Sequence, residues 1–115
     1  MFDIQIGIDI QKISDFLHAD SNSGRRIYSK IFNDEEIKLI ENLNIEQLAG
    51  RFCCKEAVIK ALYGFDIKLN YKDITISKRG KKPFAQIKDN KQLSINISMS
   101  HSKEFATAVA VVWRK

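Results

Sequence analysis

The segment from Ile4 to Ile10 places isoleucine at every second position, and this alternation constrains the fold more than any other feature of the sequence. Side chains two residues apart lie on the same face of a β-strand, so the pattern predicts a half-buried strand. The four isoleucines share its apolar face, and Gln5, Gly7 and Asp9 share its polar face. Aspartate is uncommon inside strands, so Asp9 needs an explanation.

Helical patterns follow this strand. Residues 21–24 have the composition of a loop. Asn33 and Glu36 have the spacing of a capping box, which predicts a helix start at this point. Residues 46–62 are rich in Leu, Ala, Lys and Glu and contain no proline, so we expect the main helix there, with Gly50 as its weakest position.

The chain changes character after Gly64. The remaining patterns predict strands at residues 73–77, 84–88, 94–100 and 105–113. There is no internal repeat and no linker, and 115 residues are enough for one domain. We therefore expect a single α+β domain over residues 1–115: an N-terminal strand, central helices and a C-terminal antiparallel sheet.

Charge is distributed unevenly between the two halves. Residues 1–50 carry five Lys or Arg and nine Asp or Glu, a balance of −4, whereas residues 51–115 carry fourteen and five, a balance of +9. The two balances sum to the net charge of +5, and the positive charge comes from the C-terminal half. This suggests an anionic partner met mainly by that half: nucleic acid, a phosphorylated small molecule or an acidic protein.

The location that we expect is cytosolic. No apolar run approaches the ~18 residues of a membrane span, and Met1-Phe2-Asp3 opens with an acid rather than the basic region of a signal peptide. The two adjacent cysteines, Cys53 and Cys54, match no disulfide or metal-binding spacing, which predicts reduced core residues.

Two carboxylates are candidates for chemistry. Asp9 is either a solvent-facing residue of an edge strand or a rigidly held metal ligand. In the predicted main helix, Ala49, Cys53, Glu56 and Lys60 share one face. That face could admit a ligand and offer Glu56 to a cation and Lys60 to a phosphate, or it could carry an ordinary surface ion pair.

Two further features lie in predicted turns. Residues 78–83 carry four cations, which fits either a solvated turn or a nucleic-acid patch. His101 lies between two serines at a strand end, where it could bind phosphate oxygens or make a structural hydrogen bond.

Three segments taken in order resemble the holo-acyl-carrier-protein synthase family, the short bacterial phosphopantetheinyl transferases. They are Gly7-Ile8-Asp9-Ile10, then residues 51–61 with the pattern Lys-Glu-Ala-x-x-Lys, and then residues 97–106 around His101. The resemblance implies Mg²⁺-dependent transfer of phosphopantetheine from coenzyme A (CoA) to a serine of an acidic apo acyl carrier protein. It also implies release of adenosine bisphosphate and a homotrimer with sites between subunits.

The resemblance assigns roles residue by residue. Asp9 and Glu56 correspond to the magnesium ligands, with Glu56, directly or through a water, as the serine base. Lys60 corresponds to the lysine that binds the phosphate and stabilises the leaving group. The positions that correspond to CoA contacts are Arg51, Lys60, Gly64, Pro83, His101 and Ser102.

The sequence departs from the family near Asp9. The usual Glu and Arg that follow the metal-binding aspartate are here Lys12 and Asp15, a charge swap. The missing arginine usually meets the carrier protein, so we expect Arg25, Arg26 and Lys30 to take that role. A fatty-acid or a polyketide carrier fits equally well.

Two other functions are considered beside this one. An inactive or diverged carrier-protein-binding subunit on the same fold would lose metal and CoA binding. A small basic RNA-binding domain would explain the charge, but it would not explain Asp9 or the Glu56–Lys60 face, and few aromatic residues are available for base stacking. Nucleic acid is therefore not the partner that we expect.

Overall fold

The structure is a computed structural model that describes residues 3–90 and 92–115. Met1 and Phe2, the first two residues of the acidic opening segment, lie outside the described residues. The elements in chain order are β1 (Ile4–Lys12), α1 (Asn22–Tyr28), α2 (Asp34–Ile40), α3 (Ile45–Tyr63), β2 (Ile74–Arg79), β3 (Lys82–Ile87), β4 (Leu93–His101) and β5 (Phe105–Arg114). Short 3-10 turns lie at Ile13–Asp15 and Tyr71–Asp73.

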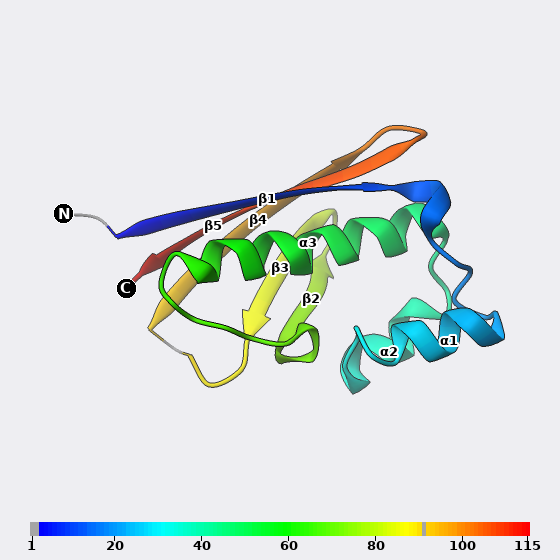
Figure 1. Cartoon of the computed structure of the whole chain (residues 1–115), viewed down its shortest axis with the longest axis horizontal. Helices are drawn as coiled ribbons and strands as arrows, with labels where there is room; N and C mark the ends of the chain where they lie inside the picture. Colours follow the sequence, from blue (N-terminus) through cyan, green and yellow to red (C-terminus); the bar gives the residue numbers. More distant parts are fainter. Residues whose placement is uncertain (1–2, 91) are drawn as a thin grey trace.

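The strands form two antiparallel groups around one long helix. β5 lies between β1 and β4 in a three-stranded sheet, and β2 pairs with β3 in a hairpin that contacts β4 through β3. Figure 1 shows α3 running along one face of the three-stranded sheet, with α1 and α2 together beyond one end of it. The expected α+β class is confirmed, and the N-terminal strand β1 joins the sheet formed by the C-terminal strands β4 and β5.

The polar face of β1, not its apolar face, is the buried one. Gly7 and Asp9 face α3, whereas Ile6, Ile8 and Ile10 are 66%, 65% and 64% exposed. A Cβ atom at Gly7 would lie 1.9 Å from the backbone oxygen of Ala57, so only glycine permits this contact between strand and helix. Residue size therefore decides which face of β1 packs in the single chain, and the isoleucines are left outside.

The neighbouring strand β5 follows the same rule. Its small residues Ala106, Ala108 and Ala110 are buried on the α3 side, and Val109 and Val111 lie opposite Ile8 and Ile6 on the outer side. Small side chains allow the helix to pack close to the sheet. The buried side chains of α3 fill the hydrophobic core between the helix and the sheet.

The start of α2 was predicted correctly from the sequence, and the start of α1 was not. Asn33 and Glu36 form the capping box predicted from their spacing. Residues 21–24 are not a loop: Ser21 accepts a hydrogen bond from the backbone N–H of Gly24 and begins α1. Serine and asparagine are common both in loops and at N-caps, so composition alone did not separate the two. No helix in the described residues is long and apolar enough to cross a membrane.

Candidate active site

Asp9 is held between β1 and α3 by two donors. Its side chain is 8% exposed, and Oδ1 lies 3.1 Å from Nζ of Lys60, one turn before the end of α3. Oδ2 accepts a hydrogen bond of 2.9 Å from Nε2 of Gln11. Lys60 also donates to the backbone oxygen of Ile8 at 3.0 Å, so it bridges to the strand instead of forming an ion pair with Glu56 on its own helix.

Glu56 lies one turn before Lys60 on α3 and is half-buried. Its Oε1 accepts a hydrogen bond from the hydroxyl of Tyr71 in the 3-10 turn before β2. Burial raises the pKa of Tyr71 to about 12, with further contributions from the hydrogen bond to Glu56 and from the negative charges of Glu56 and Asp9. Tyr71 therefore remains a donor at neutral pH, and its hydroxyl lies within the electrostatic influence of both carboxylates.

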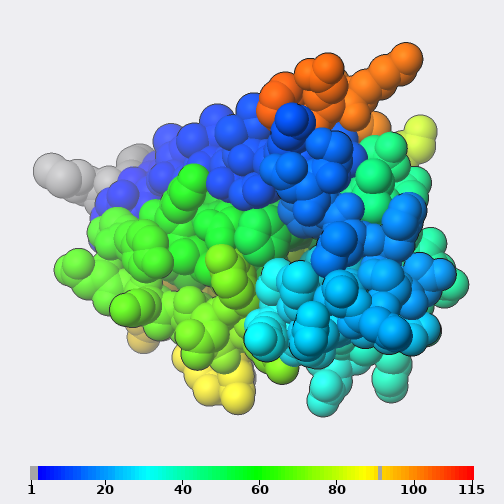
Figure 2. Space-filling view, turned by 45° about the vertical axis from the view of Figure 1, so that its right-hand side comes forward, coloured from blue at the N-terminus to red at the C-terminus, as the bar shows by residue number. Residues whose placement is uncertain are grey.

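A pocket of about 550 Å³ opens beside Glu56 and Tyr71. Three lysines from separate parts of the chain line it: Lys30, Lys68 and Lys72. None of them takes part in an ion pair within the described residues. Figure 2 shows the face on which β1 and α3 lie beside each other, with the α1–α2 segment next to the loop that follows α3. The three lysines outnumber the two carboxylates of the lining, Glu56 and Asp73, so the pocket offers an excess of positive charge to an anionic group.

His101 and Ser102 lie away from this pocket. His101 is the last residue of β4 and Ser102 follows it, beside the N-terminal part of α3, where His101 helps to line pockets of about 360 and 250 Å³. Cations from the basic turn, Lys78 and Lys81, border the second of these. A single chain thus places the predicted CoA residues in two separate regions.

The other predicted CoA residues have different surroundings. Arg51 is 6% exposed and donates to the backbone oxygen of Ile76 at 2.9 Å, and burial lowers its pKa. Pro83 is buried in β3 opposite Lys78. Gly64 follows the last turn of α3, where an added Cβ atom would lie 2.0 Å from the side chain of Gln5.

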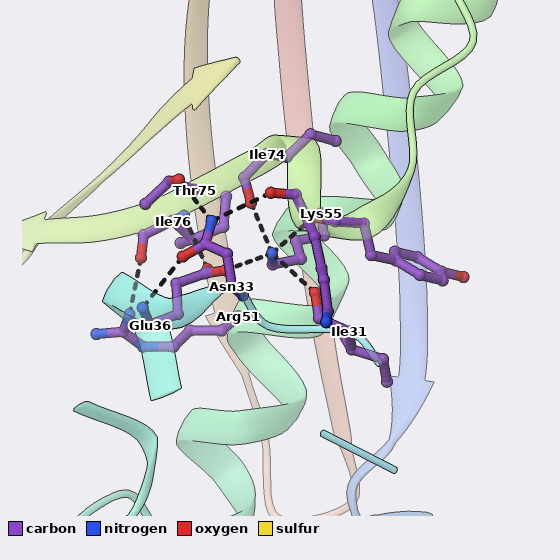
Figure 3. Close-up of polar contacts among 10 residues, drawn as sticks. Ile31, Asn33, Glu36, Arg51, Lys55, Ile74, Thr75 and Ile76 are labelled. Atoms are coloured by element: carbon purple, nitrogen blue, oxygen red, sulfur yellow. Dashed lines mark hydrogen bonds and ion pairs between the residues drawn. The ribbon is translucent and has the colours of Figure 1, made fainter. Parts of the chain in front are cut away.

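A buried ion pair, which the sequence patterns did not indicate, supports the back of the site. Nζ of Lys55 lies 2.5 Å from Oε1 of Glu36, and both side chains are almost completely inaccessible. Lys55 also donates to the backbone oxygens of Ile31, Tyr71 and Ile74 (Figure 3). The only signal in the sequence was the capping position of Glu36, which indicates a helix start and gives no sign of a partner in α3.

Cys53 and Cys54 are free and completely buried, as expected for reduced core residues. Burial raises the pKa of each thiol to about 12, and the negative charge of Asp9 adds to the effect at Cys53. Both cysteines therefore remain thiols at neutral pH, and Cys53 packs close to Asp9 without adding a charge to the site.

The described residues contain no group of three or more His, Cys, Asp or Glu side chains that could hold a metal ion by themselves. The two carboxylates at this site could contribute only part of a coordination shell. A metal held there would need further oxygen ligands from water or from a phosphorylated ligand.

Known proteins with similar sequences and folds lead to one family. A family model described as the 4′-phosphopantetheinyl transferase superfamily matches residues 5–110. A holo-[acyl-carrier-protein] synthase from Chlamydia caviae is 40% identical over 114 residues, covering 92% of this chain and 93% of the relative. The corresponding protein from Bacillus subtilis is 33% identical over 114 residues, covering 95% of this chain and 94% of the relative.

Solved structures give the same result. A holo-(acyl-carrier-protein) synthase from Bacillus anthracis in complex with CoA (3′,5′-ADP) superposes with a TM-score of 0.81 at 27% identity and covers both chains completely. A Helicobacter pylori enzyme of the same name in complex with coenzyme A has a TM-score of 0.78 at 31% identity, over 93% of this chain and 98% of that chain. The chain therefore belongs to the 4′-phosphopantetheinyl transferase superfamily and, within it, to the holo-[acyl-carrier-protein] synthase family.

Proposed function

We propose that this chain transfers the phosphopantetheine group of CoA to a serine of an apo acyl carrier protein and releases adenosine bisphosphate. The main observation behind the proposal is the contact of Asp9 from β1 with Lys60 from α3, with Glu56 one helical turn before Lys60 and lining a cationic pocket. Relatives named holo-[acyl-carrier-protein] synthase and related structures that contain CoA support it.

The serine oxygen forms a bond to the β-phosphorus of the CoA diphosphate, and the bond from that phosphorus to the bridging oxygen breaks. The bridging oxygen leaves with the electron pair on adenosine bisphosphate. Glu56 takes the serine proton, directly or through a water. Lys60 is 47% exposed at its side chain, so its ion pair with Asp9 is weak enough to be exchanged for a phosphate contact.

Magnesium is part of the proposal, and the donor set fits it. Asp9 and Glu56 supply carboxylate oxygens from two rigid elements, and Mg²⁺ commonly takes one or two protein carboxylates together with waters and substrate phosphates. The Lys60 ammonium 3.1 Å from Asp9 supports this assignment, because it places a cation within reach of that carboxylate oxygen. When bound, the metal neutralises charge on the diphosphate.

We extend the proposal to a homotrimer with active sites between subunits. The separation of His101 and Ser102 from the Asp9–Glu56 region supports shared sites, because a second copy could supply the missing group. The exposed isoleucine face of β1 supports association, since exposed apolar patches mark interaction surfaces. Contacts of Arg51, Gly64 and Pro83 with CoA remain predictions within this assembly.

The acceptor in this proposal is an acidic acyl carrier protein of fatty acid biosynthesis, and the reaction takes place in the cytoplasm. The net charge of +5 supports an acidic partner. Two free, buried cysteines are consistent with a reducing compartment.

Incubation with CoA, Mg²⁺ and an apo acyl carrier protein, followed by mass spectrometry of the carrier, tests the proposal. We expect the carrier to gain one phosphopantetheine group, and we expect no gain after removal of the metal or with a carrier whose acceptor serine is alanine. A chain that binds the carrier without modifying it would instead be a carrier-binding subunit. Salt-sensitive binding to RNA without transfer would indicate the RNA-binding alternative.

A further inference from the structure

Tyr71 is the neighbour that holds Glu56, although no sequence motif assigns it a role. The tyrosine lies in the 3-10 turn Tyr71–Asp73, between α3 and β2, and its hydroxyl donates to Oε1 of Glu56. Both residues line the cationic pocket. The contact joins a loop residue to a side chain fifteen positions earlier on α3.

The position of Tyr71 is fixed independently of this hydrogen bond. Its backbone oxygen accepts a hydrogen bond of 2.8 Å from Nζ of Lys55, which is itself paired with Glu36 in the interior. Its ring packs on Phe52, with centroids 5.5 Å apart. The hydroxyl is therefore presented to Glu56 by a buried ion pair and an aromatic contact, so it does not depend on a mobile loop.

Other cations line the same pocket as Glu56 and could attract its carboxylate. The lysines of the pocket, Lys30, Lys68 and Lys72, are free of ion pairs within the described residues, and glutamate has a long, flexible side chain. A carboxylate without a fixed donor could rotate toward any of these cations. The hydrogen bond from the Tyr71 hydroxyl gives Oε1 of Glu56 one fixed donor among these cations.

We propose that Tyr71 is a positioning residue, which holds Oε1 of Glu56 and leaves Oε2 for the metal ion and the acceptor serine. The inference rests on the proposed transferase function and deepens it. A donor of this kind, behind a metal ligand, typically affects metal affinity or activity 10–100-fold when it is removed.

The variant Tyr71→Phe tests this role, because it removes the hydroxyl and keeps the ring that packs on Phe52. We expect kcat to fall about tenfold and the Kd for Mn²⁺, measured by electron paramagnetic resonance with CoA present, to rise about tenfold. The KM for CoA should stay within about twofold of the wild-type value, because Tyr71 acts through Glu56 rather than on the nucleotide.

Tyr28→Phe is the matched control. It also removes a tyrosine hydroxyl that donates a partly buried hydrogen bond, in this case to the backbone oxygen of Leu17 in the segment before α1. We expect this variant to lower the melting temperature and to leave the Mn²⁺ affinity unchanged. The pair of variants separates loss of a buried hydrogen bond from loss of the donor to Glu56.

The outcomes also separate this inference from the proposed function. If the wild-type protein transfers phosphopantetheine and Tyr71→Phe has wild-type kcat and Mn²⁺ affinity, the role of Tyr71 is wrong and the function stands. A Tyr71→Phe protein that fails to fold, or that loses CoA affinity as much as turnover, would make Tyr71 a structural residue. If the wild-type protein transfers nothing, the function itself fails.

Discussion

Asp9 is a carboxylate inside a strand, and its neighbours explain how the fold accepts it. Lys60 and Gln11 each satisfy one oxygen, so the charge is balanced without a metal. Its partner Lys60 is half-exposed, which keeps the contribution of the pair to folding small, about 1 kcal/mol or less. The residue can therefore be changed with little effect on stability, and a chemical role can be tested separately from a structural one.

Removal of either carboxylate should abolish transfer without unfolding the protein. We expect Asp9→Asn and Glu56→Gln to lower kcat at least about 100-fold. Each variant loses a ligand of the metal ion whose positive charge would balance the diphosphate. Both variants should keep a cooperative thermal melt. Glu35→Gln, at an exposed position of α2, is the control and should retain full activity. Near wild-type turnover by either site variant would contradict the metal assignment.

Lys60 should act on turnover more than on binding. Charge on the bridging oxygen of the diphosphate grows toward the transition state, so Lys60→Ala should depress kcat more than it raises the KM for CoA. Lys68→Ala, which removes a cation from the pocket wall, should show the opposite pattern. Steady-state kinetics with varied CoA distinguish the two. An unchanged kcat in Lys60→Ala would exclude its catalytic role.

At the scale of elements, the contact of β1 with α3 depends on Gly7. A Cβ atom there would lie 1.9 Å from the backbone oxygen of Ala57 and 2.7 Å from the backbone nitrogen of Ala61. Backbone atoms of a helix cannot move aside as the end of a side chain can. We expect Gly7→Ala to lower the free energy of unfolding by about 1–3 kcal/mol, as overpacked cores do.

Gly50→Ala, in the helix α3 against which β1 packs, is the matched control. An added Cβ atom there meets only the sulfur of Met99, at 3.1 Å, and alanine has the higher helix propensity. Denaturant unfolding should therefore show a clearly smaller loss of stability than for Gly7→Ala. Equal losses at the two positions would mean that the strand–helix distance does not depend on Gly7.

The elements themselves were largely predictable from local patterns. The capping box at Asn33, the helix around 46–62 and the alternation of β1 all depend on residues close together in the sequence. The orientation of β1 was not predictable in this way, because it depends on the space beside Ala57, fifty residues away. Lys55 and Glu36, nineteen residues apart, likewise gave no periodic signal of their ion pair.

The residues of the candidate site also differ in whether the sequence alone could identify them. Asp9, Glu56 and Lys60 could be selected from spacing and family resemblance, and the structure brings Lys60 to Asp9 and places Glu56 one turn away from Lys60. Tyr71 and the pocket lysines Lys68 and Lys72 could not be selected. They follow α3 in a segment without regular periodicity, and only the folded chain returns them to the helix.

The helix α1 is the element on which carrier docking should depend. It carries Arg25 and Arg26, both exposed, and Ile27 is 43% exposed beside an apolar pocket of about 330 Å³. Asp15, in the place of the usual arginine, is exposed and lines the same pocket. A basic helix with an apolar neighbour suits an acidic partner, and its binding should weaken as salt screens the charges.

Reversal of these charges tests the docking surface. We expect the double variant Arg25→Glu and Arg26→Glu to raise the KM for the carrier protein at least about tenfold and the KM for CoA little. Asp15→Arg should lower the KM for an acidic carrier. Lys88→Glu, an exposed cation just after β3, is a control for net charge. Unchanged carrier kinetics in the double variant would move the docking site elsewhere, with residues 78–82 as the next surface to test.

At the scale of the whole molecule, the outer face of the three-stranded sheet is the feature that a single chain leaves unexplained. Ile6, Ile8 and Ile10 are each more than 60% exposed, and Val109 and Val111 of β5 lie beside them in register. Burying this face requires a second layer, and the covering layer on the other side, α3, is already in place. A homotrimer would cover the face and bring the two halves of the proposed CoA site together.

A charge in the middle of that face should therefore disrupt assembly and activity at once. We expect the wild-type protein to sediment as a trimer in analytical ultracentrifugation and Ile8→Glu to sediment as a smaller species, because a buried unpaired carboxylate opposes association. Its transfer activity should fall with the loss of the trimer, since each site would lack His101 of the partner subunit. Leu39→Glu, at a 50% exposed position on α2 away from the sheet, should remain trimeric and active. A monomeric wild-type protein with full activity would contradict the shared site, and an Ile8→Glu variant that stays trimeric would place the interface on another surface.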